Sequence, residues 1–127
     1  MAGSIRTFTK WLNHKMESTR QQKIARLVQK EIADLFQEDR SLYGGHGMVT
    51  VTRASVSKDI SYARVNVSVF GVPDKSSVMK TIEANSREIR FRLGQRVRQQ
   101  LRIIPELTFV LDETLDYIEN IDKLLKQ

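Results

Sequence analysis

A dense series of arginines runs from Arg87 to Arg102. A guanidinium group can bind phosphate through two hydrogen bonds and can also stack on a base, which a lysine cannot do. At 3.6 residues per helical turn, one side of a helix here would be basic and partly aromatic, opposite an apolar stripe. The basic side would carry Arg87, Phe91, Gly94 and Arg98, and the apolar stripe Ile89, Leu93 and Val97. Phe91 could then stack on an unpaired base.

The same charge pattern has a second interpretation. A solvated helix face whose arginines pair with acidic neighbours would show the same charge pattern in the sequence. A break at Ala84, Asn85 and Ser86 favours the binding interpretation, because new amide groups at a helix N-terminus attract phosphate. Asn85 suits an N-cap, and Glu88 three residues later can complete a capping box. A plain turn between two helices is the alternative for this break.

Catalytic chemistry finds little support in the sequence. His14 and His46 are the only histidines and lie far apart, so no metal cluster and no serine, histidine and aspartate set can be assembled. Asp112, Glu113 and Asp116 are typical of helix N-terminal charges that offset the helix dipole. We expect neither an enzyme nor a metal, cofactor or small-molecule substrate.

Composition narrows the class of partner. The chain has 127 residues, a net charge of +6 and a sequence pI near 9.8, which predicts one domain and a polyanionic partner. Cysteine is absent, as is common in a reducing compartment, so the cytoplasm is the expected location. No stretch reaches the roughly 20 apolar residues of a membrane span, so we expect a soluble protein without a membrane partner.

Hydrophobic periodicity predicts an α+β fold. Spacings of three and four indicate a helix over 18–37, and β-branched runs indicate strands over 48–57 and 60–70 that pair as an antiparallel hairpin. Asp74 is suited to cap a helix that meets a second one at the break, and period-two alternation returns over 101–112. A short C-terminal helix should follow over 115–125. Pro105 should lie at the start or on the edge of its strand.

This order, helix, strand, strand, broken helix and strand, is similar to the type II KH-like arrangement. The run from Leu101 to Phe109, LRIIPELTF, resembles the signature that ribosome-binding factor A proteins have before their last core strand. The run VSKDISYARVNVS from Val56 to Ser68 resembles the hairpin turn and following strand of that family. Arg20 to Ile24, and Ile89 and Arg90 with Leu93 and Gly94, also fit it. The resemblance covers 16–127, one KH-like domain with its C-terminal helix, and leaves 1–15 as an extension expected to be flexible.

The resemblance implies an assembly factor that binds ribosomal RNA of the immature small ribosomal subunit and assists its late maturation, with importance for growth in the cold. The family replaces the KH glycine loop with a kinked helix pair, in which Ala84 and Asn85 match the pattern and Ser86 stands where glycine is usual. We expect a monomer that holds one RNA conformation. The expected RNA contacts are Lys58, Asn85, Ser86, Arg87, Arg90, Phe91, Arg96, Arg98 and Arg102.

Two alternatives remain at this point. A protein-interaction module could use the C-terminal helix or the sheet edge, with the arginines merely solvating the surface; its binding would depend little on salt. A hydrolase or nuclease would need a divalent metal or a cluster of general bases that the sequence does not offer.

Overall fold

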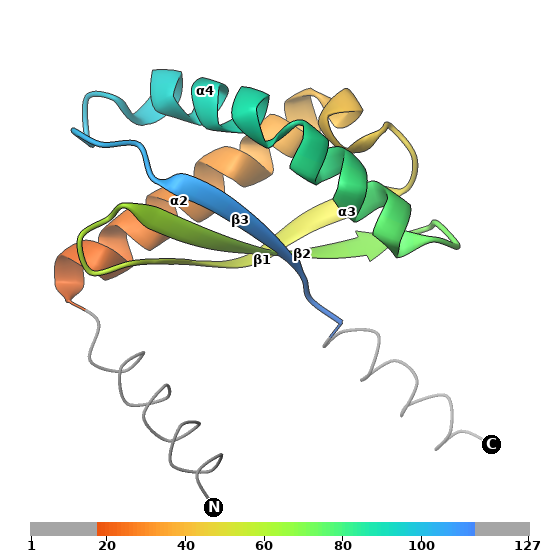
Figure 1. The fold of residues 1–127 in the computed structure, drawn as a ribbon, viewed down its shortest axis with the longest axis horizontal. Coiled ribbons are helices and arrows are strands. Elements are labelled where there is room, and N and C mark those ends of the chain that lie inside the picture. The colour runs from red at the N-terminus through yellow and green to blue at the C-terminus, as the bar shows by residue number, and fades with distance from the viewer. Residues whose placement is uncertain (1–17, 114–127) are drawn as a thin grey trace, which may run out of the picture.

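The computed structural model describes residues 18–113. Along the chain these form α2 (Thr19–Glu38), a short 3-10 helix η1 (Arg40–Tyr43), β1 (Met48–Val56), β2 (Tyr62–Phe70), α3 (Lys75–Ala84), α4 (Ser86–Val97) and β3 (Glu106–Leu111). Figure 1 shows the helices gathered on one face of the sheet. The α+β class and the element order are thereby confirmed. The expected extension over 1–15 and the C-terminal helix over 115–125 lie outside the described residues.

The first helix begins at the residue that its capping chemistry indicates. Ser18 Oγ accepts from the Gln21 amide at 3.1 Å, and Gln21 Oε1 accepts from the Ser18 amide at 3.1 Å, which forms a complete capping box. The apolar positions at helical spacing then face inward; they are Ile24, Ala25, Val28, Ile32, Leu35 and Phe36. The helix ends at Glu38, and Asp39 begins η1 by accepting from the Ser41 amide.

The three strands described form a mixed sheet in the order β1-β2-β3. β1 and β2 are antiparallel, with a bulge between Val51 and Arg53. β2 and β3 are parallel, so α3 and α4 form the crossover that connects them. No helix over 18–113 combines the length and the apolar character that a membrane crossing needs.

Two predicted strands are shorter than expected, for local reasons. The second begins at Tyr62 rather than residue 60, because Ile60 has φ of 64° inside the turn and cannot continue a strand. The third begins at Glu106 rather than residue 101, because 98–105 forms a loop that ends at Pro105, which has no amide to donate. This loop forms one wall of a groove beside α4.

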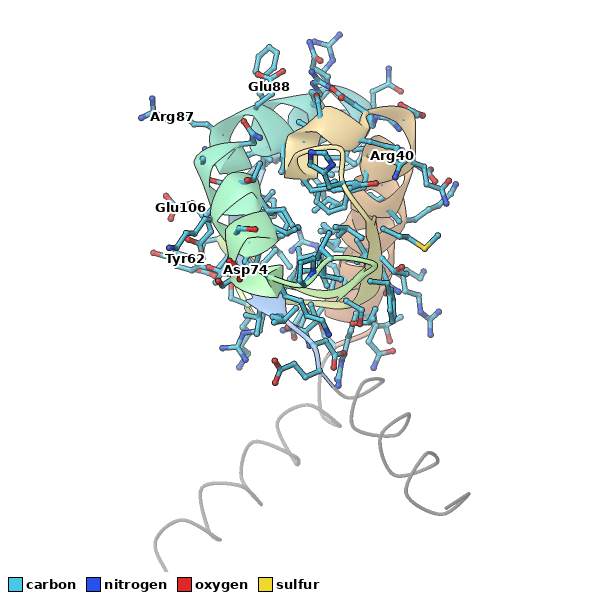
Figure 2. The ribbon with its side chains drawn as sticks, turned by 90° about the vertical axis from the view of Figure 1, so that its right-hand side faces the viewer. Arg40, Tyr62, Asp74, Arg87, Glu88 and Glu106 are labelled. Carbon is cyan, nitrogen blue, oxygen red and sulfur yellow. The ribbon has the colours of Figure 1, made fainter. Side chains whose placement is uncertain are left out.

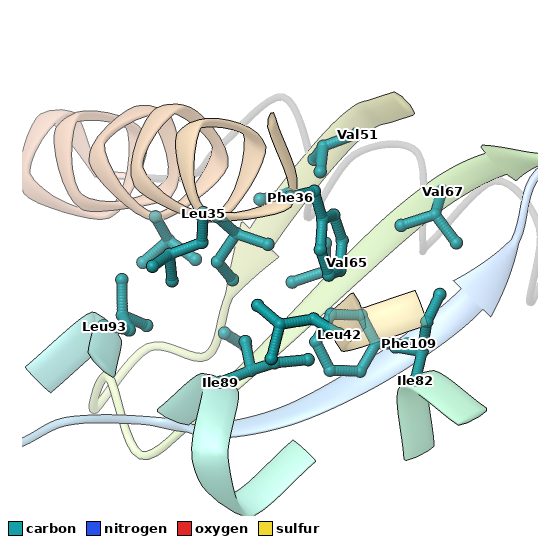
Figure 3. Packing of buried hydrophobic residues seen from close by; sticks show 14 of the residues in the cluster. Leu35, Phe36, Leu42, Val51, Val65, Val67, Ile82, Ile89, Leu93 and Phe109 are labelled. Carbon is teal, nitrogen blue, oxygen red and sulfur yellow. The ribbon is translucent and has the colours of Figure 1, made fainter. Parts of the chain in front are cut away.

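The core lies between the sheet and the helices (Figure 3). Phe36 of α2 packs edge-on against Tyr43 and obliquely against Phe109 of β3, with ring centroids 5.8 and 6.2 Å apart. Ile89 and Leu93 of α4 are fully buried beside them, which confirms the predicted apolar stripe of that helix. Each such side chain contributes about 1.5–3 kcal/mol by leaving water.

The outer edge of β1 is covered by α2. Gln21 Nε2 donates to the Val56 carbonyl at 3.3 Å, and Gln29 Nε2 donates to the Thr52 carbonyl at 3.5 Å. Two edge carbonyls that could pair with a foreign strand are therefore occupied by side chains of the protein itself.

Gly47 is the tightest point of the loop that leads into β1. Its φ is +70°, and a Cβ atom there would lie 2.4 Å from the Phe70 carbonyl oxygen. Arg40 fixes the same point by donating from an Nη atom to the Gly47 carbonyl at 2.7 Å. Only glycine fits this position.

Candidate nucleic-acid interface

The break between α3 and α4 is confirmed and is a single residue wide. Asn85 has φ −96° and ψ 8°, with its amide bonded back to Thr81 and its carbonyl accepting from the Ile89 amide at 2.9 Å. Ala84 is the last residue of α3, and Ser86 is the first of α4. Ile60 is the one non-glycine residue at positive φ among residues 18–113, so this kink needs no glycine at Ser86.

The predicted capping box at Asn85 is wrong. The Asn85 side chain makes no cap hydrogen bond; its Nδ2 donates instead to the Leu42 carbonyl at 3.0 Å, which anchors the kink to η1. Glu88, the supposed partner, accepts from Arg92 Nε at 2.8 Å. Asn85 is thus a positioning residue, and its side-chain nitrogen Nδ2 is already hydrogen-bonded within the fold.

Two arginines of α4 are neutralised by acidic neighbours, Arg96 by α2 and Arg92 by Asp39 and by Glu88 of its own helix. Arg92 pairs with Asp39 at 2.7 Å and with Glu88 at 2.8 Å. Arg96 pairs with Glu31 at 3.4 Å and also with Glu38. For these two residues the interpretation as ion pairs with acidic neighbours is confirmed. Arg96 therefore points away from the outward basic face on which a contact with RNA was expected.

The pKa values around these pairs reflect the same contacts. Hydrogen bonds to Glu88 and Asp39 raise the pKa of Arg92, and hydrogen bonds from Ser41 and Arg92 lower the pKa of Asp39. Partial burial acts to lower the pKa of Arg96, but Glu38 and Glu31 outweigh it, so that pKa is also raised. Asp39, Arg92 and Arg96 are therefore charged near neutral pH.

The opposite side of α4 forms a groove with the loop 98–105. The groove has a volume of about 730 Å³ and is lined by Arg87, Glu88, Arg90, Phe91, Gly94, Gln95, Arg98, Ile103 and Ile104. Arg90 holds the loop wall in place by donating from Nε to the Pro105 carbonyl at 3.1 Å and from an Nη atom to the Ile104 carbonyl at 2.8 Å. A Cβ atom on Gly94 would lie 3.3 Å from Ile104 Cγ1, so the absence of a side chain lets the loop approach the helix.

The groove displays apolar and cationic groups together. Phe91 is 62% exposed and Ile103 is 61% exposed. Arg87 and Arg98 are exposed and make no ion pair within residues 18–113. Figure 2 shows Arg87 projecting away from the body of the domain. The structure thus brings Arg87, Phe91 and Arg98 together on one surface, as the helical spacing predicted.

Lys58 and Arg102 lie outside this groove but at the same end of the sheet. Lys58 is exposed in the turn between β1 and β2, and Arg102 is exposed in the loop 98–105. The Glu106 amide donates to the Ser61 carbonyl at 2.9 Å, which places the end of that loop beside the turn.

Asp59 gives this turn its shape. Its carboxylate accepts from the Ser61 hydroxyl at 2.6 Å, the Ser57 hydroxyl at 2.8 Å and the Ser61 amide at 3.2 Å. These donors lower the pKa of Asp59 from 3.8 to about 2. Lys58 is therefore presented on a turn that its own neighbours hold in one conformation.

Ile103 and Gln95 are groove residues that sequence reasoning missed. The period-two pattern assigned Ile103 to a strand, whereas Pro105 was the signal that the strand starts later and leaves Ile103 in a loop. Gln95 lies between two arginines and has no charge to attract notice. His46 is exposed in its loop, and residues 18–113 contain no cluster of three or more groups that could hold a metal ion.

Comparison with known proteins agrees with this fold. The sequence profile of the family described as Ribosome-binding factor A matches residues 20–125. A protein of that name from Cytophaga hutchinsonii is 40% identical over 112 residues, which is 88% of this chain and 84% of the relative. The crystal structure of ribosome-binding factor A from Thermus thermophilus superposes with a TM-score of 0.59 at 24% identity, over 72% of this chain and 94% of that one.

A second Thermus thermophilus structure is a homology model of the factor fitted into the cryo-EM map of a 30S–RbfA complex. It has a TM-score of 0.56 at 24% identity and covers 68% of this chain and 88% of that one. At this level of identity the two structures support the fold alone. The sequence match over most of the chain establishes the family. The chain belongs to the ribosome-binding factor A family.

Proposed function

We propose that this protein binds ribosomal RNA of the immature small ribosomal subunit, through a KH-like domain, and assists late maturation of that subunit. The observation that carries the proposal is the outward side of α4, where two arginines without ion pairs in the described chain flank an exposed phenylalanine. A structural neighbour fitted into a 30S–RbfA complex supports the choice of partner. This partner implies that the protein acts in the cytoplasm. We also propose that the protein is important for growth in the cold.

The proposed contacts fall into two groups. Arg87, Arg98, Arg102 and Lys58 have exposed cations and would bind phosphates, and the first amides of α4 at Ser86 would add neutral donors. Asn85 and Arg90 act indirectly, since their side chains already hold the kink and the loop in place. Arg96 does not belong to either group, because its charge is satisfied by α2.

Binding alone would supply the mechanism, without turnover, cofactor or bond cleavage. A protein shifts an RNA equilibrium only by its difference in affinity for the two RNA states. The fixed spacing of Arg87 and Arg98 along the helix would favour the RNA conformation whose phosphates match them, and the protein would leave when that match is lost.

The test is co-sedimentation with immature and mature small subunits over a range of salt concentrations. We expect Arg87→Ala with Arg98→Ala to weaken binding and to lower the slope of log affinity against log salt by about one for each phosphate that the variant no longer binds. Arg26→Ala with Lys30→Ala is the matched control, because both residues are exposed on α2, outside the groove, and the charge change is the same.

Three results would contradict the proposal. If the wild-type protein ignored small subunits, the assembly-factor assignment would fail. If Arg87→Ala with Arg98→Ala bound as well as the control variant of α2, the two arginines would be solvated surface residues without a role in binding. Binding that hardly responds to salt would instead favour a protein-interaction module, to which the apolar side chains of Phe91 and Ile103 would be suited.

A further inference from the structure

We infer that the groove between α4 and the loop 98–105 accommodates one unpaired nucleotide of an RNA strand, with its base stacked on Phe91. This inference rests on the proposed function and specifies the form of RNA that the site recognises. The groove would bind a base of a single strand, or a base extruded from a helix, and would not bind the outer surface of a duplex.

The apolar surfaces of the groove are the first reason. Phe91 and Ile103 approach it from opposite walls, one from the helix and one from the loop, and each is more than half exposed. A duplex presents phosphates and riboses at its surface, while the flat faces of its bases stay stacked inside. An unpaired base offers such a face, and stacking on an aromatic side chain is the usual way to hold it.

The positions of the cations are the second reason. Along the axis of α4, Arg87 lies about 6 Å from Phe91 on one side and Arg98 about 10 Å on the other, at about 1.5 Å per residue. A strand that laid one base on Phe91 would therefore have an arginine available on each side for its phosphates. Glu88 also lines the groove, but its carboxylate is paired with Arg92.

Gln95 is the third reason. It follows Phe91 by four residues, so it lies one turn further on the same side of α4, and it lines the groove. Its side chain makes no hydrogen bond with other described residues and is exposed. A carboxamide can donate and accept at once, which suits the Watson–Crick edge of an unpaired base.

The groove exists before any RNA arrives. Arg90 bonds two carbonyls of the loop wall, and Gly94 lets Ile104 settle against the helix. A site with fixed walls loses little conformational freedom on binding. Its volume of about 730 Å³ is comparable with that of small-molecule sites, although the groove is open along one side.

The experiment compares two probes with the full-length protein. One is a fluorescein-labelled single-stranded RNA of CA repeats, about ten nucleotides long, and the other is the same strand annealed to its complement. Fluorescence anisotropy should show tighter binding to the single strand. A 2-aminopurine in place of one adenine should be quenched when it stacks in the groove.

Two substitutions of Phe91 separate stacking from simple apolar contact. Phe91→Leu should weaken single-strand binding about tenfold and abolish the quenching, whereas Phe91→Trp should retain both, because tryptophan keeps an aromatic face. Duplex binding should change little in either variant. Tyr62→Leu is the matched control: Tyr62 is 60% exposed but lies on the sheet, outside the groove.

The nucleotide site can fail while the proposed function holds, and the outcomes distinguish these two cases. Equal binding of the two probes, failure to bind the single strand, or wild-type behaviour of Phe91→Leu would overturn the nucleotide site. If Arg87→Ala with Arg98→Ala still weakened binding to small subunits in that case, the RNA-binding proposal would stand without the nucleotide site. Thermal unfolding of each variant shows whether a variant that does not bind is still folded, since Phe91 contributes little to the core.

Discussion

At the scale of single residues, Asp59 shows how one carboxylate can shape a turn. Three donors converge on one of its oxygens, all from Ser57 and Ser61, and Lys58 is presented between them. Because these donors favour the charged form, the pKa of Asp59 falls from 3.8 to about 2 on folding. Its contribution to stability is therefore complete above pH 3.8 and is lost as the pH falls from there through about 2.

We expect Asp59→Asn to remove that acid dependence. Urea unfolding measured from pH 6 to about pH 2 should show a smaller loss of stability for the variant than for the wild type below pH 3.8. Glu83→Gln, on the exposed side of α3, is the control for a change of one charge. Parallel curves for Asp59→Asn and the wild type would show that the turn does not depend on the charged carboxylate.

The arginines of α4 mark the limit of sequence reasoning at this scale. Helical spacing correctly set Arg87 and Arg98 opposite the buried stripe. It could not separate Arg96 from them, because the carboxylates that neutralise Arg96 come from Glu31 and Glu38, 65 and 58 residues away in the chain. The predicted cap at Asn85 was wrong for a similar reason, because the Asn85 side chain donates to a carbonyl of η1 that lies 43 residues away in the chain.

At the scale of secondary-structure elements, α4 is tied to α2 by ion pairs on one side and open on the other. Arg96→Met should remove two of those pairs and leave Glu31, which is only 18% exposed at its side chain, without its cation. We expect a loss of about 1 kcal/mol in the free energy of unfolding, measured by urea titration. RNA binding at low salt should change little.

Arg98→Met is the reciprocal variant in the same helix. It removes the same charge from an exposed position that makes no ion pair in the described chain, so stability should stay near the wild-type value while RNA binding weakens. Loss of RNA binding by Arg96→Met to the same extent as by Arg98→Met, with both variants folded, would show that the two sides of α4 are not separate in function.

Element boundaries were predictable wherever local chemistry decides them. Ser18 and Asp74 cap their helices as expected, and the alternation of buried and exposed residues in β2 follows the period-two pattern until Ser68, which is buried as well. The groove was not predictable, because its second wall depends on where β3 starts and on contacts between Arg90 and carbonyls 14 and 15 residues later. Such a loop position is set by packing rather than by composition.

At the scale of the whole molecule, we expect a monomer. The net charge of +6 opposes self-association, and the edge carbonyls of Thr52 and Val56 are already bonded to Gln29 and Gln21. Sedimentation velocity should give one species near 14.7 kDa over a wide range of concentration. A dimer that grows with concentration would contradict this, and Gln21→Ala with Gln29→Ala would show whether the uncovered edge of β1 promotes it.

The helical phase of α4 also limits how its sequence can change by insertion or deletion. Deleting one residue near the middle of the helix would rotate everything after it by about 100°. Arg96 and Val97 would leave their places against α2 and the core, and Arg98 would leave the groove. Single-residue gaps should therefore be rare within 86–97 when relatives are aligned, and length variation should gather in the loop 98–105, where a residue can be added without turning the helix.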